Sequence, residues 1–219
     1  VIALTGVGAR FSSILLDIAE NSQLIALFFA MCIAILLGMG MPTTAAYAVA
    51  ASVVAPGLIE LGIQPLVAHF FVFYFAVISA ITPPVALASY AAAGISGANP
   101  MATSFTSFKI GLTAFIVPFM FFYNAALLME GEWSVILRAF VTACIGVFFL
   151  AAAIQGWFWG AHSNWVVRVI LLIAALCMIE GGLYTDIAGA VLAAVAIVLN
   201  KIFKGKPAPE PMVSTRGMD

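Results

Sequence analysis

The sequence predicts an all-α integral membrane protein, a polytopic helical bundle with a re-entrant hairpin and a broken transmembrane helix. Of its 219 residues, 65% are hydrophobic and only 8% are charged. A soluble domain carries about 25% charged residues, and this chain has too few to cover a surface exposed to water. The apolar runs are longer than the ~10-residue alternating segments of a membrane barrel. Two of these runs are interrupted in their middle by glycine, proline and threonine.

The composition also excludes several classes of function. The formal net charge is -1, from 8 Lys+Arg and 9 Asp+Glu, so no basic field is available to attract nucleic acid. The sequence shows no Ser/His/Asp set, no paired membrane carboxylates, no His/Glu metal spacing and no phosphate-binding glycine loop. We therefore expect neither an enzyme nor an ATPase, and no cofactor. The cysteines, Cys32, Cys144 and Cys177, lie inside apolar runs and are expected to be small packing residues.

Residues 1–23 are predicted to form an amphipathic connector. Phe11, Ile14, Leu15 and Ile18 share one face at helical spacing, and polar side chains lie mostly opposite. Such a helix lies along the membrane interface or packs on the protein as an ordinary loop helix, and both interpretations stay open. Because the chain opens directly in an apolar stretch, without an initiator methionine or a signal-peptide pattern, we expect it to be the C-terminal part of a longer protein.

The first interrupted run predicts a re-entrant hairpin over residues 24–62. Residues 24–37 are an apolar run of 14 residues, which as a helix measures about 21 Å and is too short to cross ~30 Å of hydrocarbon. The run stops at the sequence GMGMPTT, residues 38–44, and a second short apolar run follows over residues 45–59. Two short helices joined by such a turn enter and leave the membrane on the same side. Carbonyl groups freed at the tip can coordinate an ion.

The second interrupted run, residues 65–95, is long enough to span but contains the sequence SAITPP at residues 79–84. Two successive prolines remove two amide donors and disfavour helical backbone at the preceding residue. We therefore expect the helix to break near Thr82 and to restart around Val85. Neighbouring interrupted segments are typical of the ion and substrate sites of transporters. The alternative is a hairpin loop outside the membrane followed by a proline-kinked span.

The two interruptions supply the candidate binding residues, because a hard cation such as sodium prefers carbonyl and hydroxyl oxygens. The ion- and substrate-binding candidates are Gly38, Gly40, Met41, Pro42, Thr43, Thr44, Ser79, Ile81, Thr82, Pro83 and Pro84. Of these, Gly40, Thr43 and Thr82 are the expected sodium ligands, mainly through backbone carbonyls and hydroxyls. Tyr47 and Tyr90 follow the two breaks and are candidates to face the same cavity, although aromatic packing is the alternative role.

The rest of the chain is predicted to contain plain spans. Residues 104–129 form one helix, with Lys109 at its start and Pro118 in its middle. Residues 131–205 hold C-terminal transmembrane helices, expected at 133–159, 165–179 and 183–202, with tryptophans at the ends of the apolar runs. Residues 206–219 are rich in proline and polar residues and are expected to be disordered. The lysines before this tail place the C-terminus in the cytoplasm.

The motifs GMGMPTT, AHF, FY and ITPPVA within residues 36–97 resemble a known family. They are similar to the large membrane subunit of tripartite ATP-independent periplasmic (TRAP) transporters, in the branch where the small and large subunits are one chain. The similarity covers residues 5–130 and is weaker over residues 131–219. The resemblance implies that residues 24–130 are the transport-domain half formed by the second part of an inverted-repeat elevator transporter.

The resemblance also implies a function. These permeases are sodium-driven secondary transporters that take organic acids and related solutes from a periplasmic substrate-binding protein. By this resemblance the turn at 38–44 and the break at 79–84 form one sodium site. The expected partners are the binding protein, membrane lipid and the N-terminal remainder of the same permease, in a multi-pass protein of the bacterial inner membrane. Because the first repeat is missing, the chain alone is not expected to transport. The alternative is a channel-type or purely structural membrane subunit without ion coupling.

Overall fold

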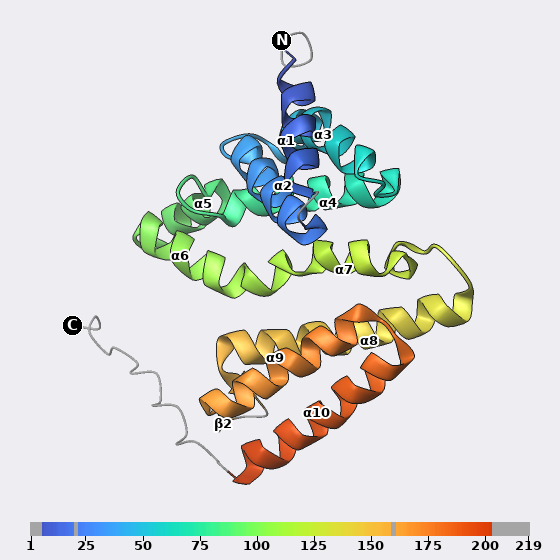
Figure 1. The fold of residues 1–219 in the computed structure, drawn as a ribbon. Coiled ribbons are helices and arrows are strands. Elements are labelled where there is room, and N and C mark those ends of the chain that lie inside the picture. Colours follow the sequence, from blue (N-terminus) through green and yellow to red (C-terminus); the bar gives the residue numbers. More distant parts are fainter. Residues whose placement is uncertain (1–5, 20–21, 159–160, 203–219) are drawn as a thin grey trace, which may run out of the picture. The chain divides into compact units, whose positions relative to one another are not determined.

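The protein is an all-α polytopic membrane protein, as the sequence predicts. Figure 1 shows the computed structural model, which describes residues 6–19, 22–158 and 161–202. Four helical stretches among them are long and apolar enough to cross a membrane, and they are Thr43–Glu60, Pro100–Tyr123, Trp133–Gln155 and Leu183–Ile202. The tail predicted to be disordered, residues 206–219, lies outside the described residues.

The chain divides into two compact units, residues 1–140 and 141–219. The boundary between the units falls inside a helix, whereas the C-terminal helices were expected to form a region that begins at residue 131. The elements of the first unit are α1 (Val7–Ala19), α2 (Gln23–Gly38), α3 (Thr43–Glu60), α4 (Pro65–Ile78), η1 (Ser79–Ile81), α5 (Leu87–Ser96), α6 (Pro100–Gly111), η2 (Leu112–Phe115), α7 (Val117–Tyr123) and η3 (Ala125–Leu128). Helix α8 (Trp133–Gln155) contains the boundary, and β1 (Trp157–Phe158), β2 (Ala161–His162), α9 (Trp165–Glu180) and α10 (Leu183–Ile202) follow.

The core of the first unit is built on small residues at helical spacing. In α2 the residues at every fourth position are Ala26, Ala30, Ala34 and Gly38, and all four are buried. Small residues on one face let helix backbones approach closely, which is how helices pack inside a membrane. Helices α3 and α4 pack against this face of the unit, and α4 adds buried aromatic side chains such as Phe71.

Helices α2 and α3 form the predicted hairpin, but its second arm is longer than expected. Helix α2 has 16 residues, or about 24 Å. Helix α3 has 18 residues and is long and apolar enough to cross a membrane. The difference arises at its start, since Thr43 and Thr44 are already helical while Pro42, with extended backbone, precedes the first turn. A re-entrant course of the hairpin therefore stays a prediction.

The predicted helix break is confirmed, and it lies between α4 and α5. Helix α4 ends at Ile78, the short 3₁₀ turn η1 follows, and regular helix resumes at Leu87. The restart is two residues later than the expected Val85, because Ala86 has φ 26° and ψ 56° and so cannot belong to a right-handed helix.

The expected single helix over 104–129 is wrong in its bounds and its continuity. Helix α6 starts at Pro100, because the side chain of Asn99 accepts a hydrogen bond from the Ala102 amide and proline is favoured at the first helical position. The helix then passes through the 3₁₀ turn η2 before α7, and Pro118 lies at the start of α7. Lys109 therefore lies in the last turn of α6, about 14 Å from the start of this helix, and not at the start of the helix as expected.

Helix α1 packs on α2 and α3. Leu15 is fully buried in the core of the first unit, Phe11 is partly buried against that core, and Ile14 is half exposed. Of the two interpretations of the amphipathic connector, the packed helix is therefore what the structure shows. Its location at the membrane interface stays a prediction.

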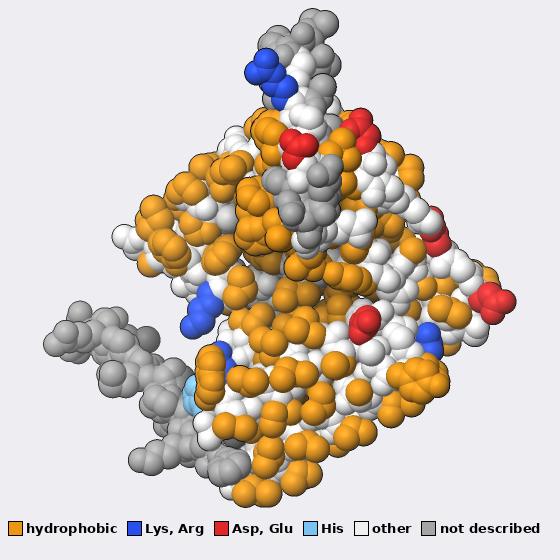
Figure 2. Space-filling view, viewed as in Figure 1, with side chains coloured by type: hydrophobic (Ala, Val, Ile, Leu, Met, Phe, Trp, Pro, Cys, Tyr) orange, Lys and Arg blue, Asp and Glu red, His pale blue; other side chains and the backbone are white. Residues whose placement is uncertain are grey.

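The face that Figure 2 shows carries many hydrophobic side chains on both units. Large hydrophobic side chains are exposed on α2, α6, α8 and α10, for example Leu36, Phe105, Phe140 and Val198. An apolar surface of this extent is rare on soluble monomers and marks a surface that lipid or another protein covers. The exposed side chains thus support the same conclusion as the helix lengths.

In the second unit α9 and α10 pack tightly, and an arginine holds the end of α8. Arg168 of α9 donates hydrogen bonds from Nε to the Ala153 oxygen at 2.8 Å and from Nη2 to the Ile154 oxygen at 2.9 Å. These carbonyls belong to the last turn of α8, where cations are favoured. Gly156, with φ 70°, lets the chain turn directly beneath the guanidinium.

Arg168→Lys is expected to lower the unfolding temperature of the purified protein in detergent. A lysine ammonium does not reproduce the planar fork that bonds to two carbonyls at once, and hydrogen bonds from charged groups contribute about 1.5–3 kcal/mol each. Lys201→Ala is the control, because that cation lies exposed on α10. Equal unfolding temperatures for Arg168→Lys and the wild type would contradict a role of Arg168 in closing α8.

Candidate functional site

The hairpin turn consists of Met39, Gly40, Met41 and Pro42. The Met39 amide donates to the Ile35 oxygen at 3.1 Å and so closes α2. Gly40 has φ 80°, a left-handed conformation that glycine adopts without strain. The Pro42 oxygen accepts the hydrogen bond from the Ala46 amide and so starts α3. The turn is therefore closed at both ends by the helices it joins.

The helix break is organised by hydroxyl groups that bond back to the preceding helix. Ser79 donates from Oγ to the Ala76 oxygen at 2.6 Å, and Thr82 donates from Oγ1 to the Ile78 oxygen at 2.9 Å. Both side chains are buried. The Thr82 oxygen in turn accepts a hydrogen bond from the Ala86 amide, so Thr82 connects the two sides of the break.

The hairpin turn and the helix break lie against each other. A β-carbon placed on Gly38 would lie 2.7 Å from the Oγ of Ser79 and 3.0 Å from the backbone oxygen of Ala76. A β-carbon placed on Gly40 would lie 3.6 Å from Cγ1 of Val85. Gly38 can come so close to Ser79 only because it carries no side chain. The fold thus brings together two interruptions that are separated by about 40 residues in the sequence.

The turn and the break both carry backbone oxygens that the helices do not use. Within the described residues, the carbonyl oxygens of Gly40, Met41 and Pro83 accept no recorded hydrogen bond. The backbone of Pro84 differs, since its oxygen accepts a hydrogen bond from the hydroxyl of Tyr90. Free carbonyls at interrupted helices are the groups that coordinate sodium in secondary transporters.

The predicted side-chain ligands lie in different environments. Thr82 is buried, whereas Thr43 and Thr44 are exposed on the first turn of α3. The hydroxyls of Thr43 and Thr44 have no recorded hydrogen-bond partner in the described part of the chain. Each hydroxyl therefore keeps its oxygen lone pairs for a ligand, and Thr82 retains a lone pair while it donates to Ile78.

The side chain of Ile81 lies against α6 and also packs on the core of the first unit. A β-carbon placed on Gly111 would lie 2.6 Å from Cδ1 of Ile81. Ile81 therefore anchors the break on α6, and a role as a ligand is left to its backbone oxygen. Pro83 is partly buried and Pro84 exposed.

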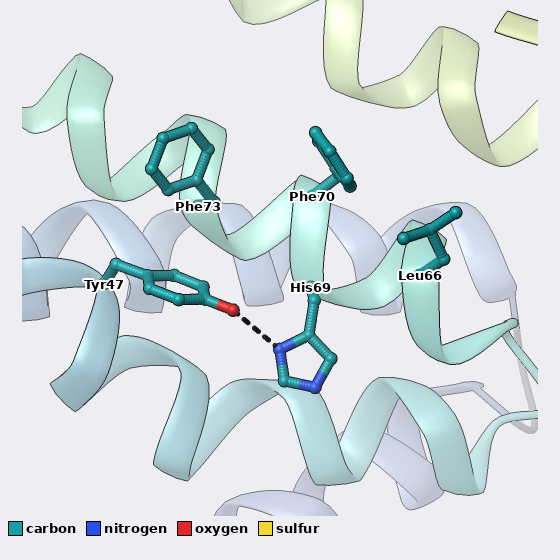
Figure 3. A pocket seen from close by; sticks show the side chains of 5 residues that line it. All are labelled: Tyr47, Leu66, His69, Phe70 and Phe73. Atoms are coloured by element: carbon teal, nitrogen blue, oxygen red, sulfur yellow. Dashed lines mark hydrogen bonds between the residues drawn. The ribbon is translucent and has the colours of Figure 1, made fainter. Parts of the chain in front are cut away.

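The two tyrosines have separate roles. Tyr90 bonds to the Pro84 oxygen and so belongs to the break. Figure 3 shows Tyr47 beside His69, and a hydrogen bond of 3.0 Å joins the Tyr47 hydroxyl to Nδ1 of His69. These two side chains, with Leu66, Phe70 and Phe73, line a mostly apolar cavity of about 360 Å³. Tyr47 thus packs between α3 and α4 in a separate cavity, as the alternative role predicted.

Four residues around the break were not predicted from the sequence. Ala86 is fully buried with a positive φ, a conformation that costs a residue other than glycine about 1–3 kcal/mol. Ser89, Ser104 and Thr113 are buried hydroxyl residues on α5, α6 and η2. A positive φ at alanine leaves no sequence signal. The serines are spaced at helical intervals from small residues, Ala93 after Ser89 and Gly111 after Ser104, but this spacing fits a lipid-facing position as well as a buried one.

The sequence of the chain also matches the model of a known protein family. The sequence model of the family described as tripartite ATP-independent periplasmic transporter, DctM component, matches residues 1–131. The match includes the hairpin, the break and α6 to η3. Neither the curated proteins nor the solved structures contain a match to the chain.

Proposed function

Because the chain belongs to the DctM component family of tripartite ATP-independent periplasmic transporters, we propose that it forms part of a sodium-coupled permease. In this proposal the permease takes organic-acid-like solutes from a periplasmic binding protein and carries them by an elevator mechanism. The family is one of transporter components and not of enzymes, and a tripartite transporter implies a binding protein and a small membrane component as partners.

The observation that carries the proposal is the contact between the hairpin turn and the helix break. Gly38 lies against Ser79, and Gly40 lies against Val85. The free carbonyls of Gly40 and Met41 belong to one partner of this contact, and the free carbonyl of Pro83 belongs to the other. Sodium is a hard cation that takes neutral oxygen ligands well, so Gly40, Thr43 and Thr82 are the ligands we propose.

The proposed location is the bacterial inner membrane, with a cytoplasmic C-terminus. Four candidate spans support a multi-pass course. Lys201 in the last turn of α10 supports the orientation, because basic residues at the ends of spans favour the cytoplasmic side.

The proposal is tested by binding of sodium-22 to the whole permease, purified in detergent, with Thr43→Val and Thr82→Val combined. We expect the half-saturating sodium concentration to rise about 10-fold or more, which corresponds to a loss of about 1.4 kcal/mol. The physical reason is that valine has nearly the shape of threonine but offers no oxygen ligand.

Thr103→Val combined with Thr106→Val is the matched control. Thr106 donates to the Ala102 oxygen at 2.9 Å, the same i−4 bond that Thr82 makes, but it is exposed on α6. Unchanged sodium binding in the Thr43/Thr82 variant would refute the site. Sodium flux through reconstituted permease that needs no binding protein would favour a channel instead.

A further inference from the structure

Buried polar side chains in the described chain gather around the helix break. Six polar residues are buried among the described residues, and five of them belong to the first unit. These five, all with hydroxyl side chains, are Ser79, Thr82, Ser89, Ser104 and Thr113. They lie on η1, at the break itself, and on α5, α6 and η2. The core formed by α2, α3 and α4 is by contrast apolar.

Three of these hydroxyls have no hydrogen-bond partner within the described part of the chain. Ser79 and Thr82 donate to backbone oxygens of the preceding helix, but no partner is recorded for the hydroxyls of Ser89, Ser104 and Thr113. Ser104 is 0% exposed, Ser89 2% and Thr113 8%. An unpaired buried hydroxyl costs about 1–3 kcal/mol, and most buried polar groups are paired with protein or water. Three such groups in one region therefore indicate a ligand or water between them.

The unpaired serines lie between two neighbouring helices. Helices α5 and α6 pack side by side (Figure 1). The buried residues of α5 are Ser89 and Ala93, one turn apart, and the buried residue of α6 is Ser104. Ser89 and Ser104 therefore lie on the buried faces of two helices that pack on each other and on η1.

This interface leads to the helix break. Gly111 is seven residues after Ser104 and so lies on the same face of α6, about 10 Å further along. Gly111 contacts Ile81 of the break, and Thr113 follows two residues later. On α5, Ser89 is three residues after Ala86, the residue that joins the break to the start of α5. The small and hydroxyl residues thus form one polar stripe from the loop between α5 and α6 to Thr82.

We propose that this stripe is a hydrated path along which a monovalent cation passes between the end of the α5–α6 pair and the break. Hydroxyl oxygens of Ser104, Ser89 and Thr113 replace part of the hydration shell of the cation in succession, as neutral oxygens do in ion-conducting proteins. The identity of the cation as sodium rests on the proposed function, while the existence of a hydrated path does not.

The test uses the whole permease with its native cysteines replaced by alanine and one cysteine introduced at a time. Ser89→Cys and Ser104→Cys exchange one oxygen for sulfur, and Thr113→Cys also removes one methyl group. All three variants are checked for folding by size-exclusion chromatography. The probe is silver ion, which is close in size to sodium and reacts with thiols that water reaches. Loss of thiol is followed by mass spectrometry after trapping of unreacted cysteine.

Two control positions define the fast and the slow limit of the reaction of a cysteine with silver ion. Ser96→Cys, at the end of α5 and next to the loop, is expected to react fast. Ala68→Cys, fully buried in the apolar core on α4, is expected to stay unreacted. We expect the three path cysteines to react within 10-fold of the Ser96 rate, and sodium to slow them when potassium does not.

The outcomes separate the path from the proposed function. Path cysteines as unreactive as Ala68→Cys would overturn the path, because the α5–α6 interface would then be dry and its hydroxyls bonded within the protein. Reaction at all three positions without protection by sodium would retain the hydrated path and remove sodium as its cation. Sodium-22 binding by the wild-type permease, measured separately, decides on sodium coupling itself.

Discussion

Gly38→Ala is expected to weaken sodium-22 binding to the purified permease about 10-fold or more. The added β-carbon would lie 2.7 Å from the Ser79 hydroxyl oxygen and 3.0 Å from the Ala76 carbonyl oxygen. The hydroxyl is held by its bond to Ala76, and the carbonyl belongs to the backbone of α4, so neither group can move cheaply. Overpacking of this kind costs about 1–3 kcal/mol. We expect the hairpin turn to move away from the break and to separate the two sets of free carbonyls.

Gly94→Ala is the matched control for this substitution. Gly94 is also a helical glycine, but a β-carbon placed on it would meet nothing within 4 Å. Alanine is favoured over glycine inside a helix by about 1 kcal/mol, so Gly94→Ala should leave sodium binding unchanged and stabilise the protein slightly.

A second substitution separates the contact from a general loss of stability. Ser79→Gly in the Gly38→Ala background removes the hydroxyl and the β-carbon against which the new methyl group would collide. We expect sodium binding to recover in part, because the close approach to the Ala76 oxygen remains. Wild-type affinity of the Gly38→Ala single variant would show that the contact of the turn with the break is not needed for the site.

Pro83→Ala combined with Pro84→Ala is expected to weaken sodium binding about 100-fold or more. The change restores two backbone amides, which can then donate to the oxygens of Ser79 and Ala80 and continue α4 through the break. A proline inside a helix costs about 3 kcal/mol or more, so two prolines supply about 6 kcal/mol in favour of the interruption. A continuous helix consumes the carbonyl oxygens that the site needs. Sodium-22 binding measures the effect.

Pro100→Ala is the control for the loss of a proline. Pro100 occupies the first position of α6, where the missing amide has no partner within the helix and the substitution costs little. Its sodium binding should equal that of the wild type. If the Pro83/Pro84 variant binds sodium as the wild type does, the break is not part of the ion site.

Helix breaks were easier to predict from the sequence than the exact ends of helices. The break near Thr82 was predictable from two prolines in one apolar run, and the restart was missed by two residues because Ala86 takes a strained conformation that its own sequence does not favour. The start of α6 was missed by four residues because the Asn99 cap and Pro100 precede the continuous apolar run. Both errors lie at helix ends, where caps decide more than hydrophobicity does.

Some of the candidate ligands were placed correctly from the sequence and others were not. The sequence placed Thr43 and Thr44 in the turn together with Gly40, but the structure has both threonines on the first turn of α3. Thr82 was correctly placed at the break, and its bond to the Ile78 oxygen follows from local geometry. The polar stripe on α5 and α6 could not be predicted, because an isolated serine in an apolar helix is equally compatible with a lipid-facing and a buried position.

By itself the sequence determined that this is a helical membrane protein with a Gly/Pro/Thr turn and a double-proline break. These features depend on side-chain hydrophobicity and on the backbone preferences of single residues. Both properties are local and need no contact with distant parts of the chain. Only the tertiary structure decided that Gly38 lies on Ser79 and that Ser89, Ser104 and Thr113 are buried without partners. Such contacts join residues that are distant in the chain, and close packing of helix faces determines which of them meet.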